Sequence, residues 1–486
     1  MSSQRVVRVR TREDGVAAHE LRDGIARIQE ELAVSPDFSA EVMAAAEAAA
    51  SNPRLPELDR TDLPMITIDP PTSRDLDQAM HLERDGDGYV VYYAIADVAA
   101  FISPGDPIDL EANKRGMTLY GADSKIPLHP TTLSEGAASL LPDQVCPALL
   151  WTIKVDETGE GTDVHVERAR VRSRSKLDYA GVQQAIDDGS AAEPLMLLKE
   201  VGELRLAREA ARGGVSLPLP EQQVAIEGDR WELEFRAQIP TEQWNAQISL
   251  LTGMCAARLM MDGRVGVLRT LPDADPRDVE RLRLSAHALG VAWPDGATPG
   301  DVIRDLDAAN PAHAALLTDA TSLLRGAAYV AFDGELPPFA MHAAIAAPYA
   351  HTTAPLRRLV DRFVGETCLA LSAGTPVPAW VRDALPELPG LMASGDKRAA
   401  EFERGCLDLV EAALLTGREG EVFEGAIVDV RADRDAGVVQ LRDPAVRGRI
   451  EGAGLPLGED VRVRLVEASV PQRKVRFELE TPRVGP

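Results

Sequence analysis

Three acidic side chains that lie close together near the start of the chain are the first candidates for chemistry. Asp69, Asp75 and Asp77 fall within nine residues, directly after a short β-forming run at 66–69 that two prolines end. In an extended chain, Asp75 and Asp77 would point to the same side, because they are two residues apart. Carboxylates on a loop are hard oxygen ligands, which suit Mg²⁺ or Mn²⁺ better than zinc. The sequence therefore predicts a site for Mg²⁺, with Mn²⁺ as the alternative.

Two ordinary interpretations compete with this metal site. Acid-rich loops are most often solvated turns, in which Asp side chains bond their own backbone. A calcium loop is the second, but that pattern needs a central glycine and a bidentate Glu at its end. Here Gln78 follows Asp77, and the chain continues as Ala-Met-His-Leu. The calcium pattern is therefore absent.

A basic segment much later in the chain is a candidate phosphate site. Pro355 predicts a helix that begins at Leu356, with Thr353 as its cap. Arg357 would then lie in the first turn, where free backbone N–H groups and a guanidinium together attract phosphate. The alternative is that Arg357 pairs with Asp361 four residues on, as a surface ion pair worth a few tenths of a kcal/mol.

The elements around these residues predict a sheet that helices cover. One hairpin is expected from 78–82 and 89–98, across an Asp-Gly-Asp-Gly turn, and a second from 146–156 and 165–171. The fold class is therefore α+β, with a mixed sheet wrapped by helices. Apolar residues at helical spacing predict helices over 177–186, 193–211, 242–261, 275–289, 299–309, 313–324, 356–371 and from 396 onward, and strands over 215–227 and 231–235.

The two ends of the chain differ from this middle part. Residues 1–60 predict a short helical extension, with helices over 16–32 and 39–50. Residues 420–486 contain five short runs of β-forming residues separated by glycine turns, which predicts an OB-fold barrel.

The composition is that of an ordinary globular protein of two to four domains, with 486 residues, 45% hydrophobic and 27% charged. No run of eighteen apolar residues and no signal-peptide pattern occurs, so neither membrane insertion nor export is expected. The four cysteines are far apart, which predicts reduced, buried thiols in the cytoplasm. The net charge of −25 argues against a basic footprint for nucleic acid. Residues 421–486 carry twelve acidic and eleven basic side chains, so almost all of the excess lies elsewhere.

Further motifs follow the acidic loop in a fixed order. After Asp69, Asp75 and Asp77 come an Ala-Ile-Ala-Asp-Val strand at 94–98, Tyr120, an Ile-Pro turn at 126–130, Leu133-Ser134 with Ser139-Leu140, and Tyr349-Ala-His-Thr-Thr-Ala-Pro355-Leu-Arg357. Over roughly residues 60–415, this order resembles the RNB catalytic domain of the ribonuclease II and ribonuclease R family.

The resemblance implies a division into a helical extension (1–60), an RNB catalytic domain (61–415) and an RNA-binding OB-fold (420–486). It implies that Asp69, Asp75 and Asp77 hold two cations, that Arg357 holds the scissile phosphate, and that Tyr120 packs against the terminal nucleotide. Further candidates for substrate binding are Gln78, Arg358, Glu403 and Arg404. Basic candidates for lining an RNA path on the barrel are Arg462, Arg464, Arg473, Lys474 and Arg476.

The activity implied by the resemblance is processive hydrolysis of single-stranded RNA from the 3′ end to nucleoside 5′-monophosphates, by a monomer without an obligate protein partner. One residue that departs from the family pattern bears on this activity. Gln78 stands where the family has a fourth Asp, so an oxygen acceptor is kept and a negative charge is lost. The second metal is then expected to bind more weakly, or Gln78 to bind the terminal hydroxyl. Two hypotheses remain: an active exoribonuclease, and an RNA-binding protein with a catalytically impaired RNB fold.

Overall fold

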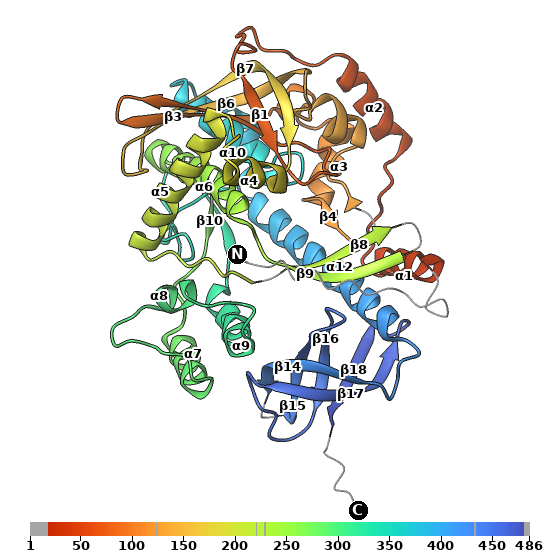
Figure 1. Ribbon diagram of the computed structural model, residues 1–486. Helices are drawn as coiled ribbons and strands as arrows, with labels where there is room; N and C mark the ends of the chain where they lie inside the picture. The colour runs from red at the N-terminus through yellow and green to blue at the C-terminus, as the bar shows by residue number, and fades with distance from the viewer. Residues whose placement is uncertain (1–17, 123–124, 220, 228–229, 432–433, 481–486) are drawn as a thin grey trace, which may run out of the picture.

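A computed structural model describes residues 18–122, 125–219, 221–227, 230–431 and 434–480 of the chain. The first part of the 1–60 extension, residues 1–17, therefore lies outside the described residues. Two closed five-stranded barrels lie at opposite ends of the molecule, with helices around the first and a long helix leading to the second (Figure 1). This arrangement confirms the α+β class, the mixed sheet and the C-terminal barrel.

The first barrel is built from the strands that flank the acidic loop. Its order is β1 (Met65–Ile68), β2 (Gln78–Asp85), β3 (Gly88–Ala96), β6 (Val145–Val155) and β7 (Gly161–Leu177). The two hairpins, β2–β3 and β6–β7, confirm the sequence prediction. The sheet closes because β1 pairs in parallel with β7, which places the end of β1 beside the end of a strand more than a hundred residues later.

Several helices cover this barrel. They are α2 (Ala40–Ser51), α3 (Pro107–Arg115), α4 (Tyr179–Asp187), α5 (Glu193–Arg212), α6 (Pro240–Gly263) and α10 (Leu359–Ser372). Glycines allow two close approaches: a Cβ atom at Gly202 would lie 2.5 Å from Cβ of Trp244, and one at Gly253 would lie 2.2 Å from Cε2 of Tyr349. Gly253 therefore fixes how closely α6 packs against the segment that carries Arg357.

A single long helix, α12 (Leu388–Leu415), connects the two barrels (Figure 1). It begins at Leu388, so the prediction of a start at residue 396 was wrong, because Pro389 and Gly390 in the first turn are weak helix formers that hid the start. The N-terminal helix α1 (Ala18–Glu31) packs along α12, with Ile28 of α1 against Gly405. The hairpin of β8 (Glu221–Glu227) and β9 (Arg230–Arg236) contacts the same helix.

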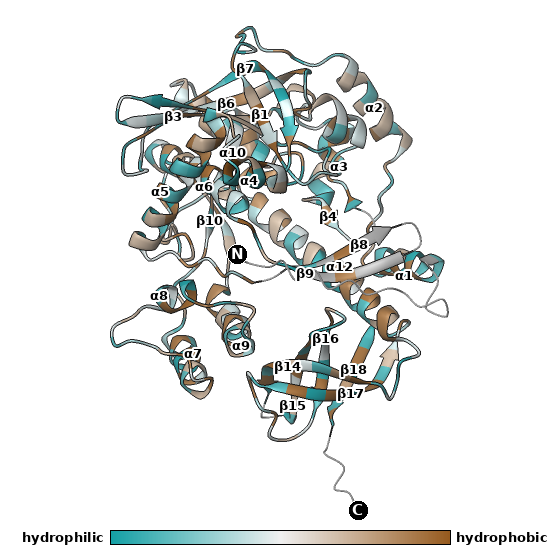
Figure 2. Ribbon diagram, in the orientation of Figure 1, coloured by the Kyte–Doolittle hydropathy of each residue, from teal (hydrophilic) through white to brown (hydrophobic). Residues whose placement is uncertain are grey.

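The second barrel has the order β14 (Val422–Arg431), β15 (Ala436–Leu441), β16 (Arg447–Glu451), β18 (Lys474–Leu479) and β17 (Asp460–Ser469). Hydrophobic and hydrophilic residues alternate along β17, as expected for a strand with one face in a core (Figure 2). Phe423 and Phe477 are buried there, with ring centroids 6.1 Å apart.

A helical subdomain lies between β10 (Val265–Thr270) and β11 (Ala328–Asp333). It consists of α7 (Pro276–Ala288), α8 (Pro299–Arg304) and α9 (Pro311–Ala320), and α9 packs against β14 of the second barrel. The remaining short elements are β4 (Leu119–Tyr120), β5 (Lys125–Ile126), β12 (Met341–His342), β13 (Ala347–Pro348) and α11 (Ala379–Ala384). The four cysteines are free and buried, as predicted. In the part of the chain that the structure describes, no helix has the length and apolarity needed to cross a membrane.

Candidate active site

The loop that carries the three carboxylates runs from the end of β1 to the start of β2, and other segments fix its backbone. The Ser139 hydroxyl donates to the carbonyl of Arg74 (2.6 Å) and accepts from the N–H of Leu76 (2.9 Å). On the other side, the Lys176 ammonium donates to the carbonyls of Pro71 (2.6 Å) and Ser73 (2.5 Å). The Ser139-Leu140 motif thus shapes the acidic loop.

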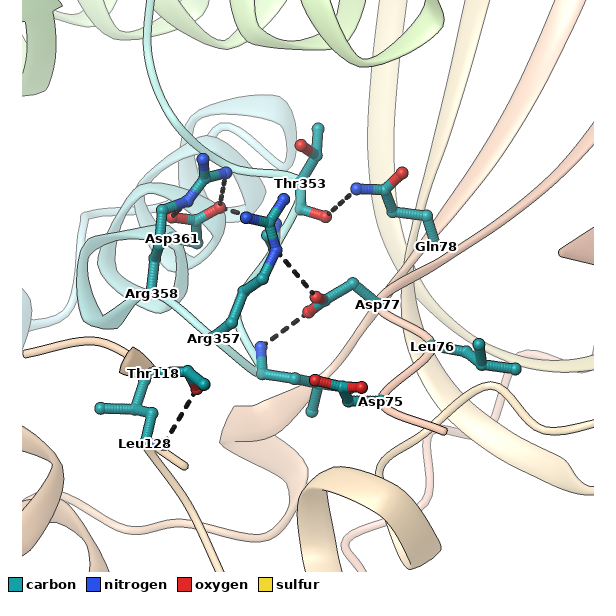
Figure 3. A network of polar contacts seen from close by, with 12 residues as sticks. Asp75, Leu76, Asp77, Gln78, Thr118, Leu128, Thr353, Arg357, Arg358 and Asp361 are labelled. Carbon is teal, nitrogen blue, oxygen red and sulfur yellow. Dashed lines mark hydrogen bonds and ion pairs between the residues drawn. The ribbon is translucent and has the colours of Figure 1, made fainter. Parts of the chain in front are cut away.

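Asp77 joins this loop to the basic segment. Its Oδ1 accepts from the N–H of Leu356 at 2.7 Å, and its Oδ2 lies 3.6 Å from Nε of Arg357 (Figure 3). Asp77 is buried, whereas 41% of the Arg357 side chain is exposed. The guanidinium is therefore accessible from solvent, and among the described residues its only polar partner is Asp77.

The basic segment differs from its prediction. Helix α10 begins at Leu359, so Arg357 precedes the helix and Thr353 does not cap it. Instead, the N–H groups of Arg357 and Arg358 both donate to the carbonyl of Ala354, at 3.1 and 2.9 Å. The resulting turn sends the two arginines in different directions.

Arg358, and not Arg357, pairs with Asp361. Its Nε and Nη2 donate to both carboxylate oxygens at 2.9 and 2.8 Å, and Asp361 also accepts from the N–H of Ala354 at 2.7 Å (Figure 3). The alternative of an Arg357–Asp361 surface pair was therefore wrong. Asp361 is buried and only 16% of the Arg358 side chain is exposed, so this pair holds the turn that presents Arg357.

Gln78 makes hydrogen bonds within the protein. Its Nε2 donates to the carbonyl of Thr353 at 2.7 Å, and its Oε1 accepts from the hydroxyls of Tyr93 and Ser249. Both ends of the amide are thus used to tie β2 to the basic segment and to α6.

Tyr120 and Lys125 face each other across the β4–β5 ribbon, beside the acidic loop. Tyr120 is 47% exposed, and burial of its hydroxyl and the nearby Asp75 raise its pKa. Lys125 Nζ lies 2.9 Å from Oδ1 of Asp75 and 2.9 Å from Oε1 of Glu135. Sequence analysis missed Lys125, because a lysine before the Ile-Pro turn gives no sign of its partner until the loops are folded.

Two of the carboxylates have raised pKa values, chiefly because they are buried. Burial, with a smaller contribution from the charge of Asp75, raises the pKa of Asp69 to about 7, although Arg357 and Lys176 lower it. Burial likewise raises the pKa of Asp77 to about 8, against Arg357 and the N–H of Leu356. Among the described residues, the Asp69 side chain has no hydrogen-bond or ion-pair partner, and no three His, Cys, Asp or Glu side chains converge as a ready ligand set. By donor type and charge, Asp69 and Asp77 fit a hard divalent cation.

Glu403 and Arg404 lie elsewhere. Both are on α12 and line a cavity between this helix and the second barrel, together with Arg449 and Asp408. The structure therefore does not bring them to the carboxylates, because this part of α12 faces the second barrel, whereas Asp396, two turns earlier, pairs with Arg269 at 3.0 Å.

The basic residues predicted to line an RNA path on the barrel all have acidic partners. Arg462 and Arg464 lie 3.2 and 3.1 Å from Glu480, and Arg473 lies 2.7 Å from Glu31 of α1. Lys474 and Arg476 lie 3.0 and 3.3 Å from Glu467. This face of the barrel is thus close to electrically balanced.

Comparisons with known proteins identify two domains along the chain. Residues 58–370 match the RNB domain, and residues 421–480 match the RNase II-type exonuclease C-terminal S1 domain. Ribonuclease R of Escherichia coli is 26% identical over 472 residues, which cover 87% of this chain and 57% of the relative. The chain thus spans little more than half the length of that curated relative.

Two solved structures show the same fold. Mycoplasma genitalium RNase R in complex with ribose-methylated single-stranded RNA matches with a TM-score of 0.83 at 18% identity, over 95% of this chain and 78% of that chain. Yeast Ssd1, described as a pseudonuclease, matches with a TM-score of 0.68 at 14% identity, over 93% of this chain and 59% of that chain. Since the RNB match covers well over half of its residues, the chain belongs to the RNB-domain family of ribonuclease II and ribonuclease R.

Proposed function

We propose that this protein is a metal-dependent 3′-to-5′ exoribonuclease that hydrolyses single-stranded RNA processively to nucleoside 5′-monophosphates, in RNA decay or processing. The observation that carries the proposal is the junction of Asp77 with Leu356 and Arg357. It places a buried carboxylate, which can bind a cation, next to an exposed guanidinium, which can bind a phosphate.

Each residue has a distinct part in this proposal. Asp69 and Asp77, with Asp75, would hold Mg²⁺ or Mn²⁺, which when bound supplies an activated water and offsets charge on the leaving 3′ oxygen. Arg357 binds the scissile phosphate through its free donors. The Tyr120 ring packs on the terminal nucleotide. Arg358 and Gln78 act indirectly, because their polar atoms bind the protein and position Arg357.

The substrate class rests on the family and on the similarity to a ribonuclease R solved with single-stranded RNA. The proposed division is a helical extension (1–60), a catalytic domain (61–415) and an RNA-binding barrel (420–486), acting as a monomer in the cytoplasm. Glu403 and Arg404 fit the RNA approach between α12 and the barrel better than the reaction itself, since they line that cavity.

The test is the fate of a 5′-labelled, unstructured RNA of about thirty nucleotides with Mg²⁺ or Mn²⁺. The native chain is expected to shorten it from the 3′ end to a short stub and to release 5′-monophosphates. Asp77→Asn keeps an oxygen acceptor for the Leu356 N–H and loses the charge, so activity is expected to fall at least about a hundredfold while the fold is kept. Equal rates for native protein and variant would contradict the proposal.

A second candidate is an RNA-binding protein without hydrolysis. It is favoured by Gln78, which replaces an acid and is bonded within the protein, and by the similarity to a pseudonuclease. RNA retained in a gel shift, without shortening under either metal, would identify this function.

A further inference from the structure

Lys125 is a cation that belongs to the site and that the proposed mechanism does not use. It leaves the β4–β5 ribbon opposite Tyr120, and its ammonium lies between Oδ1 of Asp75 and Oε1 of Glu135, 2.9 Å from each. Only 25% of its side chain is exposed, and 13% of that of Asp75. Charges that are so poorly hydrated interact more strongly than a surface pair.

The ion pair with Lys125 occupies the Asp75 carboxylate. Asp77 is oriented by the N–H of Leu356, and Asp69 has no partner among the described residues, whereas Asp75 is already neutralised. Gln78 cannot replace it as a ligand, because its Oε1 accepts two hydroxyl hydrogen bonds and its Nε2 donates to Thr353. Two anionic ligands therefore remain for metal.

We propose that the Lys125 ammonium takes the place of one of the two cations, so that the acidic loop binds a single divalent ion. This inference rests on the proposed function for its meaning, but it concerns metal binding alone. The loss of an acid at position 78 and the presence of a lysine beside Asp75 then belong together, because each removes part of a second metal site.

The test counts Mn²⁺ bound to the full chain without RNA, from the loss of the electron paramagnetic resonance signal of free Mn²⁺. The native chain is expected to bind one Mn²⁺. Lys125→Met has a similar length and no charge, so it is expected to free Asp75 and to bind a second Mn²⁺. A native chain that binds two or none, or a Lys125→Met variant that still binds one, would overturn the inference.

Two further variants separate the charge from general effects on folding. Lys125→Arg keeps the positive charge and is expected to bind one Mn²⁺, as the native chain does, so a second ion in this variant would contradict the inference. Lys154→Met removes the lysine of a distant pair, in which Nζ lies 3.6 Å from Asp85, and is expected to bind one. An unchanged circular dichroism spectrum shows that each variant is folded.

The inference and the proposed function fail in different ways. One bound Mn²⁺ in a native chain that leaves RNA intact would keep the role of Lys125 and reject the exoribonuclease. RNA degradation by a native chain that binds two Mn²⁺ would keep the enzyme and reject the role of Lys125.

Discussion

The neighbouring residues Arg357 and Arg358 differ in their partners and in their exposure. Arg357 points to Asp77 and 41% of its side chain is exposed, whereas Arg358 forms a two-point pair with the buried Asp361 and only 16% of its side chain is exposed. A buried charge that loses its partner costs far more free energy than an exposed one. The first arginine is therefore available for substrate and the second for structure.

Replacing each arginine with alanine should separate these duties. Arg358→Ala leaves the Asp361 carboxylate buried without its partner, so we expect a loss of about 3–5 kcal/mol of unfolding free energy. Arg357→Ala is expected to cost about 1 kcal/mol or less and to lower RNA hydrolysis at least about a hundredfold. Urea unfolding and the RNA assay measure the two effects. A native-like stability of Arg358→Ala would show that its pair with Asp361 is not structural.

Gln78 is a third case in which the bonds of a side chain decide its role. Gln78→Glu has the same shape but no N–H group, so two oxygens would face each other at the carbonyl of Thr353. We expect a destabilisation of about 1–3 kcal/mol and no gain in activity, although an acid has been restored. Gln184→Glu, at an exposed position of α4, is the matched control and should be neutral. Faster RNA hydrolysis by Gln78→Glu would show that the hydrogen bonds of Gln78 within the protein do not decide its role.

The position of Arg357 depends on how closely α6 packs against the segment before α10. Gly253 has no side chain at this contact, and its carbonyl accepts a hydrogen bond from the N–H of Ala350 at 3.1 Å. Tyr349 fills the space beside it, in edge-to-face contact with His351. A small residue on one helix therefore sets the place of a functional residue on another element.

We predict that Gly253→Ala moves this segment. The new methyl group would lie 2.2 Å from the Tyr349 ring and 2.6 Å from the carbonyl of Ala350, and backbone cannot give way as a flexible side chain can. A loss of about 1–3 kcal/mol is expected, with at least about tenfold lower RNA hydrolysis. Gly390→Ala, in open space on α12, should keep activity and not lower stability. Full activity of Gly253→Ala would show that the position of Arg357 does not depend on the close packing at Gly253.

The sequence predicted those elements whose signals are local. Helix α2 begins after Ser39, whose hydroxyl accepts from the N–H of Val42, and the β2–β3 hairpin turns at its glycines as expected. The start of α10 was misplaced, because the residues after Pro355 form a turn in which the N–H groups of Arg357 and Arg358 both donate to the carbonyl of Ala354, and the helix begins only at Leu359.

Contacts between distant segments were beyond the reach of local patterns. The parallel β1–β7 pair that closes the first barrel leaves no periodic mark in either strand. The carboxylates and Arg357 were found because their types and order are unusual, whereas the partners of Lys125 and Gln78 are defined only by loops that meet in the fold.

The molecule as a whole is held together at the junction of α12, the β8–β9 hairpin and the second barrel. Glu411 of α12 accepts from Nε2 of Gln222 at 2.7 Å and from the N–H of Arg447 at 2.8 Å. One buried carboxylate thus bonds both the hairpin and the barrel. Burial raises its pKa to about 7, although these two hydrogen bonds lower it.

The stability of the molecule should therefore depend on pH through Glu411. Below its ordinary pKa of 4.5 the group is protonated in both states, and as the pH rises toward 7 the unfolded chain ionises first, so stability is lost. We expect Glu411→Gln to match the native chain near pH 4.5 and to be more stable by about 3 kcal/mol above pH 8. Thermal unfolding at both pH values measures this difference.

The control for this prediction is Glu419→Gln, which changes an exposed carboxylate a few residues away. It should shift the unfolding temperature equally at both pH values. If Glu411→Gln behaved in the same way, the buried carboxylate would not be the source of the pH dependence.

The union of Asp77 with Leu356 and Arg357 also sets the order of events during synthesis. The three carboxylates leave the ribosome early, but their partners follow only after residue 357 of 486 has been made. For most of its translation, a nascent chain therefore carries the three carboxylates without Arg357.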